Sequence, residues 1–184
     1  MCKPVGSHAI VAMCLAVSWL IATPAIAKPQ EVRVRSQSEL SFGTFMVFGS
    51  GSRSVSASGA VIDSAIVTLD GRQPRPARFT IEYDRGNESK HVLDVTIELV
   101  MSAPSSLLFG GVNARLSAFE TDLPGHSRVA SGEAMTIRLT GCRTRVCSRT
   151  FTVGGRLDIS RNFGGARVDI PISIDARITG RDRL

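Results

Sequence analysis

The chain contains few of the residues that build catalytic sites. Its 184 residues include one tryptophan, one tyrosine and three histidines, and aromatic residues make up 5% of the sequence. It has no G-x-S-x-G nucleophile motif, Walker phosphate loop or H-E-x-x-H zinc motif. The sequence therefore predicts a protein that is not an enzyme and that uses no cofactor. A glycosidase-type pair of carboxylates stays open, because the fold and not the sequence spacing sets the distance between two such groups.

The chain also has few residues that could form a metal site or a nucleic-acid-binding site. Beyond residue 27 the candidate zinc ligands are His91, His126, Cys142 and Cys147, and their spacing is unlike that of zinc sites, which normally take four ligands. The arginines are not interleaved with aromatic residues on which bases could stack. We therefore predict no metal site and no nucleic-acid partner.

Residues 1–27 have the pattern of a secretory signal peptide. Lys3 is the only charged residue ahead of an uncharged run over residues 9–20, and Ala25 and Ala27 form a small-x-small cleavage site. A run of about 12 residues is too short to cross a bilayer, which needs roughly 20. Cleavage before Lys28 would leave 157 residues, with no later stretch apolar enough for a membrane helix. We expect export to the periplasm, the cell surface or the extracellular space, without stable membrane insertion.

Two cysteines, Cys142 and Cys147, follow the predicted cleavage site. An even pair of cysteines in an exported chain indicates a disulfide bond. In the loop-entropy model a ring this short contributes only about 2 kcal/mol to stability. The predicted role of the bond is to fix the shape of the loop Arg143–Val146.

Positive charge is concentrated in the last third of the chain. Without Lys3, 21 of the 22 Lys and Arg residues stand against 16 acidic residues, which gives a net charge of +5. From Arg138 onward ten arginines face four aspartates, so this part alone carries +6. One interpretation is a set of solvent-facing arginines that alternate along strands. The alternative is a basic face that binds anionic glycans, with Arg143, Arg145 and Arg149 as the contacts.

Alternation of apolar and polar residues dominates the chain after residue 27, and no long helical periodicity competes with it. The pattern is clear in Arg78–Tyr83, Leu93–Leu99 and Val168–Ile174. Turn signals such as Asp70-Gly71 recur roughly every 8–12 residues, so the sequence predicts about nine or ten short strands in a β-sandwich. Pro171 has no N–H to donate to a neighbouring strand, so we expect an edge or a bulge there.

Three segments together resemble a known family. They are Leu40–Phe45 (LSFGTF), Pro76–Ile81 (PARFTI) and Phe151–Leu157 (FTVGGRL), the last followed by Gly164-Gly165 and a final alternating strand. In this order they resemble a bacterial domain-of-unknown-function family of exported, pilin-like proteins. The resemblance implies an immunoglobulin-like sandwich akin to fimbrial subunits. The full expectation is an all-β protein with a single antiparallel immunoglobulin-like β-sandwich after a cleaved signal peptide.

The expected organisation has four parts: a signal peptide (1–27), an N-terminal arm or first strand (28–39), the sandwich (40–178) and a C-terminal tail (179–184). Five apolar residues of the three segments are candidate core residues. These are Phe42, Phe45, Phe79, Phe151 and Val153.

The resemblance implies a structural role, as a pilus- or fimbria-like subunit or an adhesin-related surface protein. The partners would be other pilus subunits or further copies of the chain, and a periplasmic chaperone. In such assemblies an extended segment of one subunit adds a strand to the sheet of the next. Val32 and Val34 are the candidate anchors of such a donor strand, within Lys28–Glu39. The same segment is also predicted as the protein's own first strand.

Overall fold

The structure is a computed structural model that describes residues 28–87, 91–104, 106–109, 111–160 and 164–184. The predicted signal peptide, with Ala25 and Ala27, lies outside these ranges. The described part of the chain contains no helix long and apolar enough to cross a membrane. Its twelve strands are β1 (Glu31–Ser38), β2 (Leu40–Val55), β3 (Val61–Thr68), β4 (Ala77–Asp84), β5 (Leu93–Ser102), β6 (Leu107–Phe109), β7 (Val112–Thr121), β8 (Arg128–Val129), β9 (Ala134–Cys142), β10 (Val146–Ser160), β11 (Gly164–Ile170) and β12 (Ser173–Arg183).

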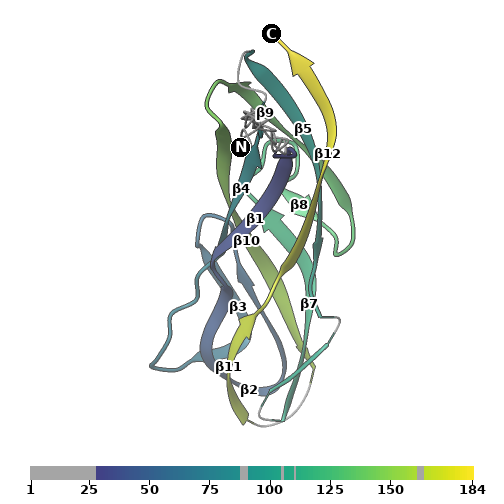
Figure 1. Cartoon of the computed structure of the whole chain (residues 1–184). Helices are drawn as coiled ribbons and strands as arrows, with labels where there is room; N and C mark the ends of the chain where they lie inside the picture. The colour runs from purple at the N-terminus through teal and green to yellow at the C-terminus, as the bar shows by residue number, and fades with distance from the viewer. Residues whose placement is uncertain (1–27, 88–90, 105, 110, 161–163) are drawn as a thin grey trace, which may run out of the picture.

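The strands form two antiparallel sheets that enclose one core. The larger sheet has nine strands and contains the path β1-β4-β10-β2-β11, with β3 beside β2 and with β7, β6 and β8 joined through β10. The smaller sheet has the order β12-β5-β9. The molecule is elongated: β1 begins and β12 ends at one end, and β2, β3 and β11 reach toward the other (Figure 1). The predicted all-β sandwich is confirmed.

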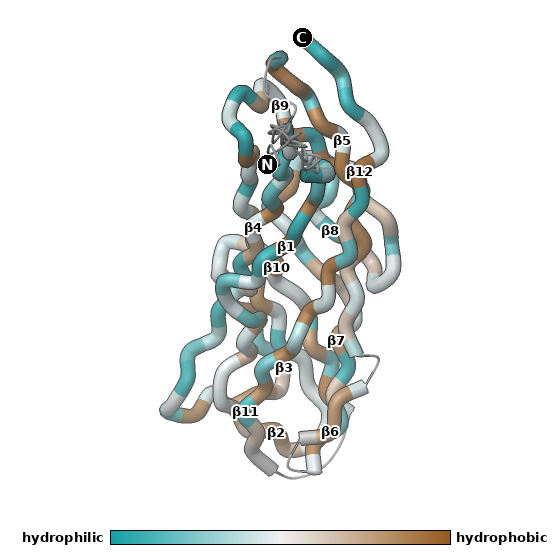
Figure 2. The backbone as a smooth tube through the Cα atoms, in the orientation of Figure 1, coloured by the Kyte–Doolittle hydropathy of each residue, from teal (hydrophilic) through white to brown (hydrophobic). Residues whose placement is uncertain are grey.

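Alternation along the strands places one row of side chains of each strand in the core. Figure 2 shows hydrophobic and hydrophilic residues following one another along the tube. The rings of Phe79 and Phe151, on neighbouring strands, stack with centroids 5.7 Å apart. All five predicted core residues are buried: Phe42, Phe45, Phe79, Phe151 and Val153.

The larger sheet is organised around a change of neighbours along β10. Val153 pairs with β4 on one side and with β7 on the other. Two residues later, Gly155 pairs with Val55 of β2 and still with β7. Between them, a Cβ on Gly154 would overlap the carbonyl oxygen of Val55. Glycine is therefore required where β2 replaces β4 beside β10.

Pro171 separates two strands that the sequence pattern had joined. The alternation over Val168–Ile174 predicted a single closing strand, but β11 ends at Ile170 and β12 begins at Ser173. β11 pairs with β2 in the larger sheet, whereas β12 pairs with β5 in the smaller one. Because proline cannot donate a ladder hydrogen bond, the chain leaves one sheet here and enters the other.

Both ends of the described chain belong to the sandwich. The segment expected as an arm or first strand forms β1, which pairs with β4 from Glu31 to Ser38. Residues 179–183, expected as a tail, continue β12 and pair with β5 as far as Arg183. The sandwich therefore extends beyond the expected range 40–178 on both sides. Polar residues misled the tail prediction, since an edge strand tolerates charge along its length.

Arg53 is a fully buried cation that fastens β2 to β3. Its guanidinium makes two parallel hydrogen bonds to Asp63, Nε to Oδ1 at 2.6 Å and Nη2 to Oδ2 at 2.7 Å. Nη1 donates to the carbonyl oxygen of Phe42 at 2.8 Å, and Nη2 also donates to the hydroxyl of Thr68. The group lies over the ring of Phe45, 5.1 Å from its centroid. A planar guanidinium suits this combination of bidentate pairing and ring contact.

We expect Asp63→Ala to lower the free energy of unfolding by about 3–5 kcal/mol, because it leaves a buried cation without its counter-charge. Arg53→Met removes the buried charge and keeps most of the volume, so its loss should be clearly smaller. Equilibrium urea unfolding of the chain beginning at Lys28 measures both. An equal or larger loss for Arg53→Met would contradict this role of Asp63.

Candidate functional site

The predicted disulfide is present and joins the two sheets. Cys142 ends β9 in the smaller sheet and Cys147 lies near the start of β10 in the larger one, with Cα atoms 5.6 Å apart. Cys142 is buried and Cys147 is half-buried. The bond therefore does more than shape its loop, because it ties the sheets together at the end where β1 begins.

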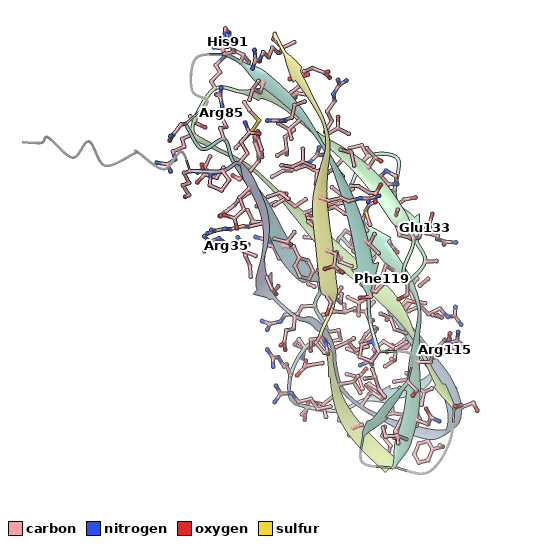
Figure 3. The ribbon with its side chains drawn as sticks, turned by 45° about the vertical axis from the view of Figure 1, so that its right-hand side comes forward. Arg35, Arg85, His91, Arg115, Phe119 and Glu133 are labelled. Atoms are coloured by element: carbon pink, nitrogen blue, oxygen red, sulfur yellow. A yellow bond between two sulfur atoms is a disulfide. The ribbon has the colours of Figure 1, made fainter. Side chains whose placement is uncertain are left out.

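A buried arginine supports the disulfide loop from inside. Arg85 is only 1% exposed, and its Nη1 donates to the carbonyl oxygens of Cys142 and Arg143 at 3.0 and 3.1 Å. Its other terminal nitrogen donates to the carbonyl oxygen of His91. Arg85 and His91 lie together at this end of the molecule (Figure 3). A covalent bond and charge-assisted hydrogen bonds thus hold the same loop.

Asp84, the last residue of β4, joins the predicted start of the mature chain to the disulfide loop. Its carboxylate accepts hydrogen bonds from Lys28 Nζ at 2.8 Å, from the backbone N–H of Gly86 at 2.9 Å and from Arg145 Nε at 3.3 Å. These partners, Lys28 first, hold the pKa of Asp84 well below its ordinary value. Gly86 has φ +64°, and a Cβ there would overlap the carbonyl oxygen of Lys28.

The three arginines predicted to contact an anion do not form one free cationic surface. Arg145 is engaged with Asp84. Arg149 is half-buried and lies on the same face of β10 as the buried Phe151, while Arg143 is exposed on the disulfide loop. The three arginines are close in sequence but lie in different surroundings, because side chains alternate between the two faces of β10 and because Asp84 binds Arg145.

Several other arginines are paired with acids on the outer faces of the sheets. Arg35 contacts Glu82 across β1 and β4 at 2.7 Å, and Arg177 contacts Glu98 across β12 and β5 at 2.6 Å. Exposed pairs of this kind contribute little to stability. Their placement agrees with the interpretation of arginines alternating along solvent-facing strands.

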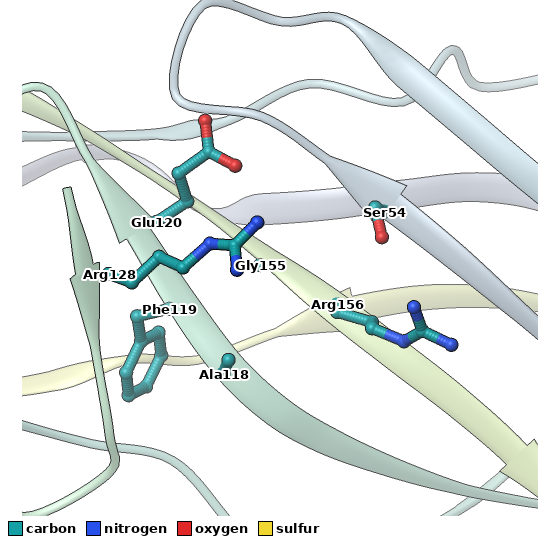
Figure 4. Close-up of a pocket in the computed structure, with 7 residues that line it drawn as sticks. All are labelled: Ser54, Ala118, Phe119, Glu120, Arg128, Gly155 and Arg156. Atoms are coloured by element: carbon teal, nitrogen blue, oxygen red, sulfur yellow. The ribbon is translucent and has the colours of Figure 1, made fainter.

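A hollow of about 200 Å³ lies on the outer face of the larger sheet. Arg128 reaches toward Gly155 and Glu120 projects from the neighbouring strand (Figure 4). Arg156 also lines the hollow, and its Nε donates a hydrogen bond to Oδ1 of Asp158 at 2.9 Å. Over the described ranges, no three His, Cys, Asp or Glu side chains are grouped to hold a metal ion.

The edge strands β1 and β12 lie beside each other although they belong to opposite sheets (Figure 1). Within the described chain, β1 pairs only with β4 and β12 only with β5, so each strand leaves one backbone edge without a neighbouring strand. The core-facing residues of the two strands are half-buried, and we call them the open seam: Val32, Val34, Ile174, Ala176 and Ile178.

The open seam contrasts with the strand behind it. The matching row of β5, which includes Ile97 and Leu99, is fully buried. A hollow of about 460 Å³ lies between Gln30, just before β1, and residues 178–181 of β12. The seam is therefore a place where apolar side chains of both sheets approach the surface beside strand edges that no other described strand covers.

A family model matches residues 32–168, from β1 into β11. The chain belongs to the DUF4402 family, a domain of unknown function. No match is found among curated proteins. The matched part of this DUF4402 protein contains β1, the disulfide and the Gly154 junction, whereas β12 lies beyond it.

Sequence reasoning missed the two buried arginines of this DUF4402 chain. Arg53 occupies the same face of β2 as the buried Val55, and its partner Asp63 lies opposite it on β3. An arginine in the apolar phase of a strand, with an acid in the next strand, was the available signal. Arg85 carries no such signal, because it binds backbone carbonyls, which any residue supplies; those of Cys142 and Arg143 come from a distant segment and that of His91 from the adjoining loop.

Asp84→Asn should reduce the stability of the protein at pH 6 and have less effect at pH 2–3. The lowered pKa of Asp84 means that its contribution is present above the ordinary pKa of about 4 and is lost as the pH falls through the lowered value. Urea unfolding at several pH values measures the difference between wild type and variant. Asp70→Asn, on an exposed turn, is the control for loss of one acidic charge. A difference that stays constant with pH would contradict the role of Asp84.

Proposed function

We propose that this protein is an exported structural subunit of a pilus- or fimbria-like assembly, or an adhesin-related surface protein, and not an enzyme. The observation that carries the proposal is the open seam. There, within the described chain, two edge strands of opposite sheets each have one side without a neighbouring strand, beside apolar side chains. The resemblance of the three sequence segments to exported, pilin-like proteins supports the same role.

An extended segment from another subunit suits the seam physically. Such a segment would pair its backbone with β12 and place alternate apolar side chains between Val32 or Val34 on one side and Ile174 or Ile178 on the other. Burying the half-exposed rows would give affinity, and alternation would set the register. A head-to-tail contact of this kind does not close on itself and produces chains of subunits.

The segment Lys28–Glu39 enters this proposal in a specific way. In the single chain it is β1, and its apolar side chains Val32 and Val34 pack against the chain's own core. Only Glu39 separates β1 from β2. Donation of β1 to a neighbour would therefore require it to leave β4, whereas a donor from a different subunit would leave β1 in place.

The protein beginning at Lys28, with its disulfide oxidised, should form complexes larger than dimers when it is mixed with subunits secreted by the same cells. Ile178→Ser removes an apolar contact of the seam and should shift the population toward species no larger than dimers. Thr179→Ser, at an exposed neighbouring position, should assemble like the wild type. Size-exclusion chromatography with light scattering measures the masses, and thermal unfolding checks that both variants fold.

Two results would contradict the proposal. One is a wild-type protein that never exceeds a dimer, alone or mixed with subunits secreted by the same cells. The other is larger oligomers that persist unchanged when Ile178 is replaced.

A further inference from the structure

The hairpin of β2 and β3 displays most of the large apolar side chains that solvent reaches. Seven such side chains occur in the described residues, and four of them are on this hairpin: Phe48, Val61, Ile62 and Val67. Phe48 is 67% exposed and Ile62 is 71% exposed. Scattered apolar residues on a surface are ordinary, but a cluster on one element marks a contact surface.

Three of these side chains share the outer face of the sheet. Val67 pairs with Met46 and Ile62 pairs with Ser54. Met46 and Ser54 alternate with the buried residues of β2, so they lie on the outer face of the sheet, and their partners lie on that face too. Phe48 follows the buried Val47, and its side chain lines one hollow together with Val67. We call Phe48, Ile62 and Val67 the β3 edge patch.

The edge strand β3 also carries fewer charges than the edge strands β1 and β12. Within the described chain it pairs only with β2. Its single charged residue, Asp63, is held by Arg53. By comparison, β1 carries Arg33 and Arg35 on its exposed face, and β12 carries five charged side chains. Natural proteins place charges on edge strands to prevent pairing with other chains, and β3 has less of this protection than β1 or β12.

We propose that the β3 edge patch is the interface with a second copy of this chain, formed by antiparallel pairing of β3 with its own symmetry mate. Around a two-fold axis each β3 meets an identical edge whose one charged residue, Asp63, is already paired with Arg53, so no unpaired like charges are brought together. Ile62 and Val67 of each copy would then pack beside the outer-face side chains of the partner's β3, while Phe48 on β2 lies one strand further back. A partner of strong charge of either sign would find no complementary group on this strand.

The shape of β3 predicts a weak dimer. Ala65 has φ +55°, and the pairing of β2 with β3 shifts register between Val47 and Ser52. This irregularity divides the edge into two short arms, so few backbone hydrogen bonds can form across the interface. Stable interfaces usually bury about 800 Å² on each partner, and an eight-residue edge provides less.

The contact is distinct from the open seam. A two-fold contact through β3 closes on itself and stops at the dimer, whereas the seam is a head-to-tail contact that continues into chains. The two are therefore distinguishable by mass. A wild-type protein that forms a dimer and never a larger species would contradict the proposed assembly role and leave the β3 contact intact.

The test uses Ile178→Ser as the background, so that only the dimer is observed. Two double variants are compared in it: Ile62→Lys with Val67→Lys, and Ile62→Glu with Val67→Glu. Each should be monomeric alone at concentrations where the background forms dimers, because like charges then face each other. Mixing the two should restore a heterodimer that weakens as salt is added. Sedimentation velocity measures the species present.

Val146→Lys is the matched control, because it places the same charge at an exposed apolar residue at the start of β10, away from β3. It should leave the dimer unchanged. A background protein that is monomeric at every concentration would overturn the proposal. So would dimers that persist in both charged variants, or a mixture that stays monomeric. Binding of the background monomer to lipid vesicles through Phe48 would assign the patch to a membrane surface instead, and would equally overturn it.

Discussion

The larger sheet depends on the close approach of two backbones at Gly154. On one side of β10 the paired strand changes from β4 to β2 at this residue, while β7 stays paired on the other side. The carbonyl oxygen of Val55 occupies the space that a Cβ would need. Any side chain at this position would push β2 away and interrupt the sheet where its two halves meet. The Gly154-Gly155 pair is part of the sequence segment that suggested the family, and the steric overlap at Gly154 explains why glycine is needed there.

The same arrangement decides where the molecule has open edges. Because Pro171 sends the chain from β11 to the smaller sheet, the last strand lies beside the first strand and not beside β11. The disulfide and Arg85 then fasten the two sheets at that end. The two sheets are therefore held together beside the open seam, so an added strand would meet a preformed surface. At the other end β3 is left with an edge that carries no free charge.

Much of the fold was predictable because alternation is a local signal. The five core residues, the disulfide and the all-β class follow from the period-two pattern, the cysteine count and the predicted export signal. The division at Pro171 was not predicted, since its alternating neighbours look the same whether they form one strand or two. The strand over residues 179–183 was missed because its polar residues are tolerated on an edge.

The candidate sites were less predictable, since they depend on contacts between distant segments. Arg143, Arg145 and Arg149 are close in sequence, yet Asp84 and the direction of the strand assign them to different surroundings. The open seam requires knowing which strands are the edges of each sheet. Sequence indicated Val32 and Val34 as anchors but left open whether they serve their own domain or a neighbour.

The most direct test of this account concerns β1 in the isolated protein. Amide hydrogen exchange of the oxidised monomer beginning at Lys28 should show residues 31–38 protected, and limited proteolysis should spare them. Removal of Lys28–Glu39 should then expose β4 and lower the stability of the remaining domain. Rapid exchange and cleavage of this segment, with no loss of stability on its removal, would show that β1 is a free arm and would contradict the account.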